Sequence, residues 1–140
     1  MSGNIKIEKI WKDVDFFEVM VTCANENITA SSPVYLTNTL VDQLHDEIDS
    51  LLSTISDLIS WQSHAPAGSA DPCFALKMWR KDSTGHVRIE VYLELNDGGD
   101  LNKHNCCFYI DTEIGLLYEF NQKLDTIKNG EIGTVISLLE

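Results

Sequence analysis

Hydrophobic and polar residues alternate with a period of two along the first third of the chain. The clearest run covers residues 16–23, and such alternation is typical of a strand with one buried face. Its apolar side consists of Phe17, Val19, Val21 and Cys23. Similar runs at residues 5–11 and 28–36 predict two more strands, with a turn at residues 25–27. Because Pro33 has no backbone N–H, the third of these strands should lie at a sheet edge.

The period becomes helical over residues 38–59. At about 100° per residue, the apolar positions fall within an arc of roughly 120°. They are Leu40, Val41, Leu44, Ile48, Leu51, Leu52, Ile55, Leu58 and Ile59. This pattern predicts one amphipathic helix, with Thr37 or Thr39 as its N-cap.

The second half of the chain repeats this succession of strands and a helix. Residues 60–73 contain two prolines and a glycine and predict a loop, in which Trp61 should cover the edge of the core. The following elements are strands at residues 74–81, 87–95 and 104–110, a helix capped by Thr112 and ending at Gly130, and an apolar segment at residues 132–139 that fits a strand or a docking tail. The turn at residues 82–86 predicts a hairpin with Gly85 at positive φ.

These elements predict an α+β fold with a mainly antiparallel sheet of about six strands and two helices, in the order βββα-βββα plus a possible C-terminal strand. The 140 residues, 44% of them hydrophobic, predict a single domain over residues 1–140, with the loop at 60–73 inside it. The apolar runs are too short to cross a membrane. No secretory signal is evident at the start, so we expect a cytoplasmic protein.

Acidic residues dominate the charge of the chain. There are 22 acids and 10 Lys and Arg, a net charge of −12, and no basic residue lies between Lys12 and Lys77. Such a surface repels phosphates, which argues against binding to nucleic acid or to an anionic membrane and favours a basic protein as partner. Four acids fall within an arc of roughly 80° on the polar side of the predicted helix. They are Asp42, Asp46, Asp49 and Asp57.

Motifs for catalysis, cofactor binding or metal binding are not found in the sequence. The four histidines form no recognisable triad order, and the sequence contains no Walker loop, no dinucleotide-binding motif and no zinc-protease motif. Glu90 and Glu94, with Asp111, could be paired carboxylates, but the strand alternation places Glu90, Tyr92 and Glu94 toward solvent beside Arg88. We therefore expect no catalytic residue, no cofactor and no enzymatic activity.

The cysteines are expected to be free thiols. A zinc site built from His104, Cys106 and Cys107 with His64 or Cys73 would lack the usual paired spacing. Cys106 and Cys107 are adjacent in a predicted strand, so one should point inward and the other outward. We expect no metal site.

The order of features resembles that of the WapI-like group of bacterial immunity proteins. The most specific piece is residues 85–91 (GHVRIEV), which are similar to a Gly-His-Val hairpin of that group, and the N-terminal strands and Leu-rich helix agree in spacing. The resemblance implies a small α+β protein that is encoded beside a polymorphic, contact-dependent toxin. It also implies inhibition by covering or distorting the toxin's active site, with Gly85 and His86 forming a turn.

Charge and resemblance together lead to one main hypothesis: a non-catalytic immunity protein that binds and neutralises a basic toxin domain, such as a nuclease, through its acidic surface. The expected contact residues are Asp42, Asp46, Asp49, Asp57, Glu90, Tyr92 and Glu94. One alternative is a structural or regulatory protein that forms homo-oligomers through a strand edge or sheet face. Another is a small enzyme in which the loop at residues 60–73 covers His64.

Overall fold

The computed structural model describes residues 2–64, 71–96 and 104–139, and within them it contains eight strands and two helices. In chain order these are β1 (Gly3–Lys12), β2 (Phe17–Asn25), β3 (Thr29–Leu36), α1 (Asn38–Leu52), β4 (Leu58–Gln62), β5 (Phe74–Arg80), β6 (His86–Glu94), β7 (Asn105–Glu113), α2 (Ile114–Asn129) and β8 (Val135–Ser137). The predicted α+β class and the order of elements are confirmed. The strand missed by the sequence analysis is β4.

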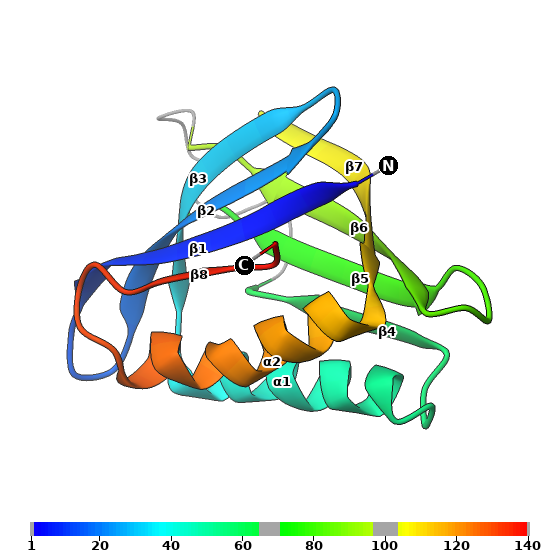
Figure 1. The fold of residues 1–140 in the computed structure, drawn as a ribbon. Helices are drawn as coiled ribbons and strands as arrows, with labels where there is room; N and C mark the ends of the chain where they lie inside the picture. Colours follow the sequence, from blue (N-terminus) through cyan, green and yellow to red (C-terminus); the bar gives the residue numbers. More distant parts are fainter. Residues whose placement is uncertain (1, 65–70, 97–103, 140) are drawn as a thin grey trace.

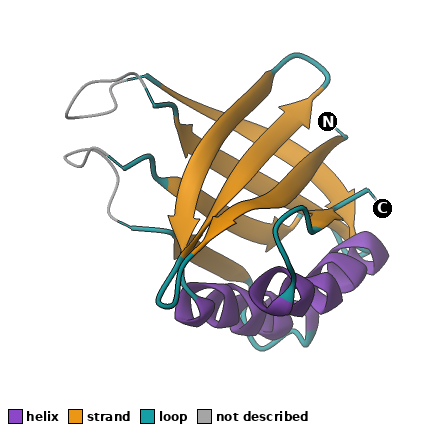
Figure 2. Cartoon of the chain, turned by 90° about the vertical axis from the view of Figure 1, so that its left-hand side faces the viewer, coloured by secondary structure: helices purple, strands orange, loops and turns teal. Residues whose placement is uncertain are grey.

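The strands form two antiparallel sheets, with the orders β3-β2-β1-β8 and β4-β5-β6-β7. Figure 1 shows the two sheets facing each other, with α1 and α2 side by side beneath them. The view in Figure 2 places both helices along the base of the strands. On one side the sheets meet, because Ser2 forms an isolated bridge with Asp111 and Asn25 Nδ2 donates to the carbonyl oxygen of Tyr109 at 2.9 Å.

A single apolar core joins the inner faces of both sheets to the helices. The alternation predicted for β2 is confirmed, since its four apolar residues are all buried. The helices contribute Val41, Leu44, Ile48 and Leu51 from α1 and Leu117, Phe120, Leu124 and Ile127 from α2. Each buried aliphatic or Phe side chain contributes about 1.5–3 kcal/mol relative to an exposed one, so this core fixes where the helices lie.

The first helix is shorter than the sequence predicts. Thr37 is its N-cap, as expected, but α1 ends at Leu52 and the chain then turns through Thr54, whose φ is +62°. Ser and Thr compete with the helical backbone for hydrogen bonds, and the residues after Leu52 are rich in them. The apolar spacing of Leu58 and Ile59 also fits a strand, and these residues belong to β4.

Each helix ends against a basic side chain from a strand. Arg80 of β5 donates to the last two carbonyl oxygens of α1, at 2.5 and 3.2 Å. Lys9 of β1 donates through Nζ to the carbonyl oxygens of Lys128 and Gly130 at the end of α2, at 3.1 and 3.0 Å. The carboxyl end of a helix carries partial negative charge, so both contacts hold the helices against the sheets.

The register confirms that Pro33 lies at a sheet edge. The N–H of Asn25 donates to the carbonyl oxygen of Ile28, and hydrogen-bonded pairs alternate with non-bonded ones along an antiparallel ladder. Pro33, which pairs with Met20, falls in a non-bonded pair, so its missing N–H points away from β2.

Several predictions for the second half need correction. Trp61 is buried as predicted, but it lies in β4 rather than in a loop. Thr112 belongs to β7, which extends to Glu113, and Glu113 takes the N-cap position of α2 without a side-chain hydrogen bond. Gly85 has the expected positive φ, +93°, and the possible C-terminal strand is present as β8. Residues 65–70 of the predicted loop, and residues 97–103 between the predicted strands at 87–95 and 104–110, lie outside the described residues.

None of the helices in the described part of the chain combines the length and apolar character needed to cross a membrane.

Candidate partner-binding surface

Side chains between α1 and α2 engage two of the four predicted helix acids. Asp42 accepts a hydrogen bond from Lys128 Nζ at 2.5 Å, and Asp49 accepts one from the buried Asn121 amide at 3.0 Å. These two contacts from α2 partly relieve the repulsion between like charges on α1. The side chains of Asp42 and Asp49 are still 55% and 56% exposed.

The other acids near α1 face solvent more freely. The Asp46 side chain is 83% exposed. Asp57 is also exposed, but its predicted place on the helix is wrong, because it lies in the turn between α1 and β4. Glu47 adds a carboxylate on the flank of α1. The helix carries four acids and no Lys or Arg, so this side of the protein keeps a negative potential.

Three residues of α1 form a possible set of cation ligands. The set consists of His45, Asp46 and Asp49, each of which offers one ligand atom, and these three atoms lie within 4.8 Å of one another. It is the one such group of three or more His, Cys, Asp or Glu residues found among the described residues. His45 Nδ1 is 3.7 Å from Asp46 Oδ1 and 3.6 Å from Asp49 Oδ2. These three residues lie close together because they are neighbours on one surface of α1, and they form part of its acidic surface.

The outer face of the β4-β5-β6-β7 sheet carries mixed charges instead. Its side chains form rows across the strands: Gln62, Ala75, Tyr92 and Cys107; Ser60, Lys77, Glu90 and Tyr109; and Leu58, Trp79, Arg88 and Asp111. Glu90 lies 4.0 Å from Lys77. Asp111 accepts hydrogen bonds from Arg88 at 2.8 and 3.1 Å and from Lys81 at 2.9 Å. These contacts, above all that with Arg88, hold the pKa of Asp111 well below its usual range.

Glu94 is buried, which corrects its predicted position on the solvent face. Its side chain is held inside the protein because Oε1 accepts from the backbone N–H of Cys73 at 2.9 Å and Oε2 accepts from the Tyr92 hydroxyl at 2.7 Å. Burial, reinforced by the hydrogen bond to Glu94, raises the pKa of Tyr92. The alternation of β6 is therefore broken at its end, where Leu93 and Glu94 are both buried.

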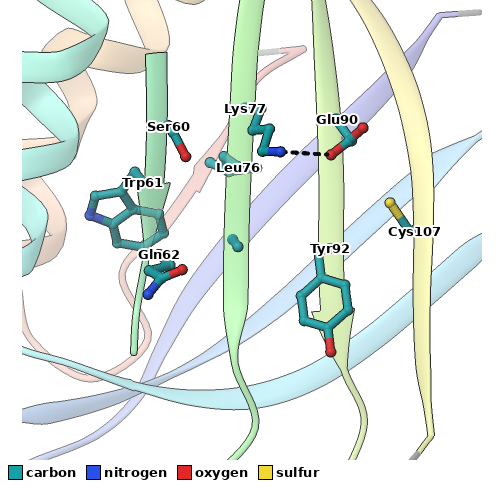
Figure 3. Close-up of a pocket in the computed structure, with 9 residues that line it drawn as sticks. Ser60, Trp61, Gln62, Leu76, Lys77, Glu90, Tyr92 and Cys107 are labelled. Carbon is teal, nitrogen blue, oxygen red and sulfur yellow. Dashed lines mark ion pairs between the residues drawn. The ribbon is translucent and has the colours of Figure 1, made fainter. Parts of the chain in front are cut away.

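A shallow hollow of about 450 Å³ lies on this sheet face. It forms where the small Ala75 is surrounded by larger side chains of neighbouring strands. Figure 3 shows Ser60 and Gln62 on one side of the hollow, the Lys77–Glu90 pair above it, and Tyr92 and Cys107 on the other side. Tyr92 and Glu90 thus border this hollow, and the Tyr92 hydroxyl donates to Glu94.

The four cysteine thiols and His64 make contacts within the fold or lie in the faces of strands. Cys106 lies on the inner face of β7 and Cys107 on the outer face, as predicted. Burial is the main reason that the pKa of each of the four thiols is raised, which keeps them protonated at neutral pH. His64 Nε2 lies 2.7 Å from the carbonyl oxygen of Asp71.

The sequence analysis missed two residues outside α1 that bind acids of this helix. Lys128 and Asn121 are more than 70 positions away, and no local pattern links them to Asp42 and Asp49. It also missed an exposed aromatic cluster, in which the Phe16 ring lies 5.4 Å from that of Trp11 and 5.6 Å from that of Tyr35.

Comparison of the chain with protein-family models, curated proteins and solved structures gives no match.

Proposed function

We propose that this protein is a non-catalytic immunity protein that acts in the cytoplasm, where it binds and neutralises a basic toxin domain. The supporting observation is the charge imbalance around α1. The acids there are Asp42, Asp46, Glu47, Asp49 and Asp57. Within the described part of the chain, Lys128 is the one Lys or Arg that forms an ion pair with them.

Such a surface favours a cationic partner for a physical reason. Complementary potentials raise association rates by factors of about 10 to 1000 and discriminate against partners of like charge. A nuclease needs a basic cleft to hold phosphates, so an acidic surface can occupy that cleft in place of the substrate. Occlusion of this kind requires contact but no chemistry from the immunity protein.

The proposal is tested by reversing charge at two exposed acids that are not bonded to Lys128 or Asn121. Asp46→Lys combined with Asp57→Lys should slow association with the catalytically inactivated toxin domain encoded by the neighbouring reading frame. We expect a decrease of about tenfold to hundredfold at low salt, and a weaker dependence of the rate on salt. Stopped-flow fluorescence measures both quantities.

The matched control is Glu8→Lys combined with Glu26→Lys, which changes the net charge equally on another part of the surface. Figure 1 shows the β2–β3 turn, which contains Glu26, at the end of the molecule opposite the helices. Equal association rates for the two double variants would contradict the proposed role of the α1 acids.

Growth rescue on co-expression with the active toxin tests neutralisation itself. Failure of the wild-type protein to rescue growth, together with sedimentation that shows a concentration-dependent homo-oligomer, would instead favour the self-associating alternative.

A further inference from the structure

The unpaired edge of β4 is a feature that the acidic surface alone does not explain. β4 pairs with β5 on one side, and among the described residues no strand pairs with its other side. The N–H of Ser63 donates to the carbonyl oxygen of Phe74 at 2.9 Å, which fixes the alternation of bonded and non-bonded pairs along this ladder. Every second residue of β4 therefore points its N–H and C=O groups away from β5. These residues are Leu58, Ser60 and Gln62.

The surroundings of this edge are hollowed on both sides. Between the edge and α1 lies a groove of about 470 Å³, lined by Gln43 and Glu47 from the helix and by residues 60–62 of β4. The hollow on the outer sheet face includes the same three residues of β4 and extends to Glu90. An added chain could therefore lie along β4, with the Glu47 carboxylate beside it.

As far as the described residues show, β4 also lacks the features that normally block edge-to-edge pairing. Edge strands are commonly protected by proline, by charged side chains or by a covering segment. Pro33 removes a donor from the edge of β3, and Ser2 and Asn25 contact the edge of β7. The five residues of β4 (LISWQ) include no proline and no charged residue.

We propose that an extended segment of the basic partner adds as a further strand to the edge of β4 that is unpaired among the described residues, with a Lys or Arg side chain beside Glu47. This inference rests on the proposed function and names the contact by which the basic toxin would be held. Backbone hydrogen bonds from Ser60 and Gln62 would supply affinity, as in other cases of strand addition, and the Glu47 carboxylate would select for positive charge.

Amide hydrogen exchange followed by NMR tests the geometry directly. In the free protein the N–H groups of Ser60 and Gln62 should exchange rapidly, whereas those of Ile59 and Trp61, which face β5, should be protected. The probe is an acetylated and amidated peptide of alternating Thr and Lys, at millimolar concentration. It should protect Ser60 and Gln62 and bind at least about tenfold more tightly than the corresponding Thr-Glu peptide.

Matched variants separate the backbone contact from stability. Ser60→Pro removes one outward N–H and should weaken peptide binding about three- to tenfold, the equivalent of one hydrogen bond. Ser60→Ala keeps the N–H and should bind as the wild type does. Ser31→Pro makes the same change at the outward-facing position of β3 and serves as the control for stability and for non-specific charge binding.

The outcomes distinguish this inference from the proposed function. Peptide or toxin binding that leaves Ser60 and Gln62 unprotected, or that is equal for Ser60→Pro and Ser31→Pro, would overturn strand addition while leaving the acidic-surface proposal to its own charge-reversal test. A dimer that forms in sedimentation and is lost in Ser60→Pro would show that the occupant is a second copy of this chain, which also overturns it.

Discussion

Replacement of Lys9 by methionine should destabilise the protein strongly, although Lys9 lies far from any proposed contact. Its side chain is only 3% exposed. Nζ donates to the carbonyl oxygens of Lys128 and Gly130 at 3.1 and 3.0 Å, and it lies 4.4 Å from the centre of the Phe17 ring. Methionine has a similar length but offers no donor, so two carbonyl groups at the end of α2 would lose this partner.

The expected change in the free energy of unfolding is the balance of lost contacts and a removed desolvation cost. Loss of a donor costs about 1–3 kcal/mol for each buried carbonyl group left unpaired, and the loss of a cation at a helix carboxyl end costs about 0.3–1 kcal/mol. Burial lowers the pKa of Lys9, which reflects a desolvation cost that methionine would remove. We expect a net loss of about 2–4 kcal/mol, which lowers Tm by roughly 6–16 °C for a chain of this length.

Urea unfolding followed by tryptophan fluorescence measures this difference. Lys6→Met is the matched control, because Lys6 lies on the same strand with its side chain exposed on the opposite face. If Lys9→Met and Lys6→Met differ by less than about 0.5 kcal/mol in free energy of unfolding, the buried ammonium does not hold α2 in place and the reasoning fails.

Three further predictions concern other buried or paired groups. The hydrogen bonds from Arg88 depress the pKa of Asp111, so its stabilising contribution is complete above about pH 4 and is lost as the pH falls further. Asp111→Asn should therefore lower the urea midpoint at pH 7, with the difference from wild type narrowing below about pH 4. Asn121→Asp would bury a carboxylate against Asp49 and should cost about 2–4 kcal/mol at pH 7, whereas Asn121→Leu should stay within about 1 kcal/mol of wild type in the same unfolding assay. Cys107 should react with iodoacetamide before the other three thiols but more slowly than free cysteine at pH 7, because burial raises its pKa, and mass spectrometry would identify the modified site.

The sequence predicts best those elements whose signal is local. The period of two in β2 and β6 reflects the alternation of side chains across a strand. The four apolar residues expected to face inward from β2 are buried, and so are Val87, Ile89, Val91 and Leu93, while Leu95, the fifth expected in the strand at 87–95, is half-buried. Thr37 and Gly85 were identifiable for the same reason, because a helix cap and a tight turn depend on the neighbouring few residues. These local signals were sufficient for the α+β class and the order of elements.

The features that sequence reasoning missed depend on distant contacts. The spacing of Leu58 and Ile59 fits both a helix and a strand, and pairing with β5 selects the strand. Glu94 sits where simple alternation predicts solvent, but the backbone of Cys73, brought in by the preceding loop, buries its carboxylate. From the sequence alone, Lys9 resembles any other surface charge, because the carbonyl oxygens that bind it belong to the end of α2, more than 100 residues later in the chain.

Most basic residues of the described chain are occupied within the fold. Lys9 and Arg80 contact the helix ends, Arg88 and Lys81 contact Asp111, and Lys12, Lys77 and Lys128 each pair with a carboxylate. The excess of acids is therefore concentrated in groups such as Asp46 and Asp57, which are exposed. Like charges on one surface weaken a fold slightly. The Asp46 carboxylate lies 3.7 Å from His45 Nδ1, and its side chain is 83% exposed. The proposed attraction to a cationic partner rests on these exposed acids, and the neutral edge of β4, where we propose that the partner's backbone pairs, lies beside them.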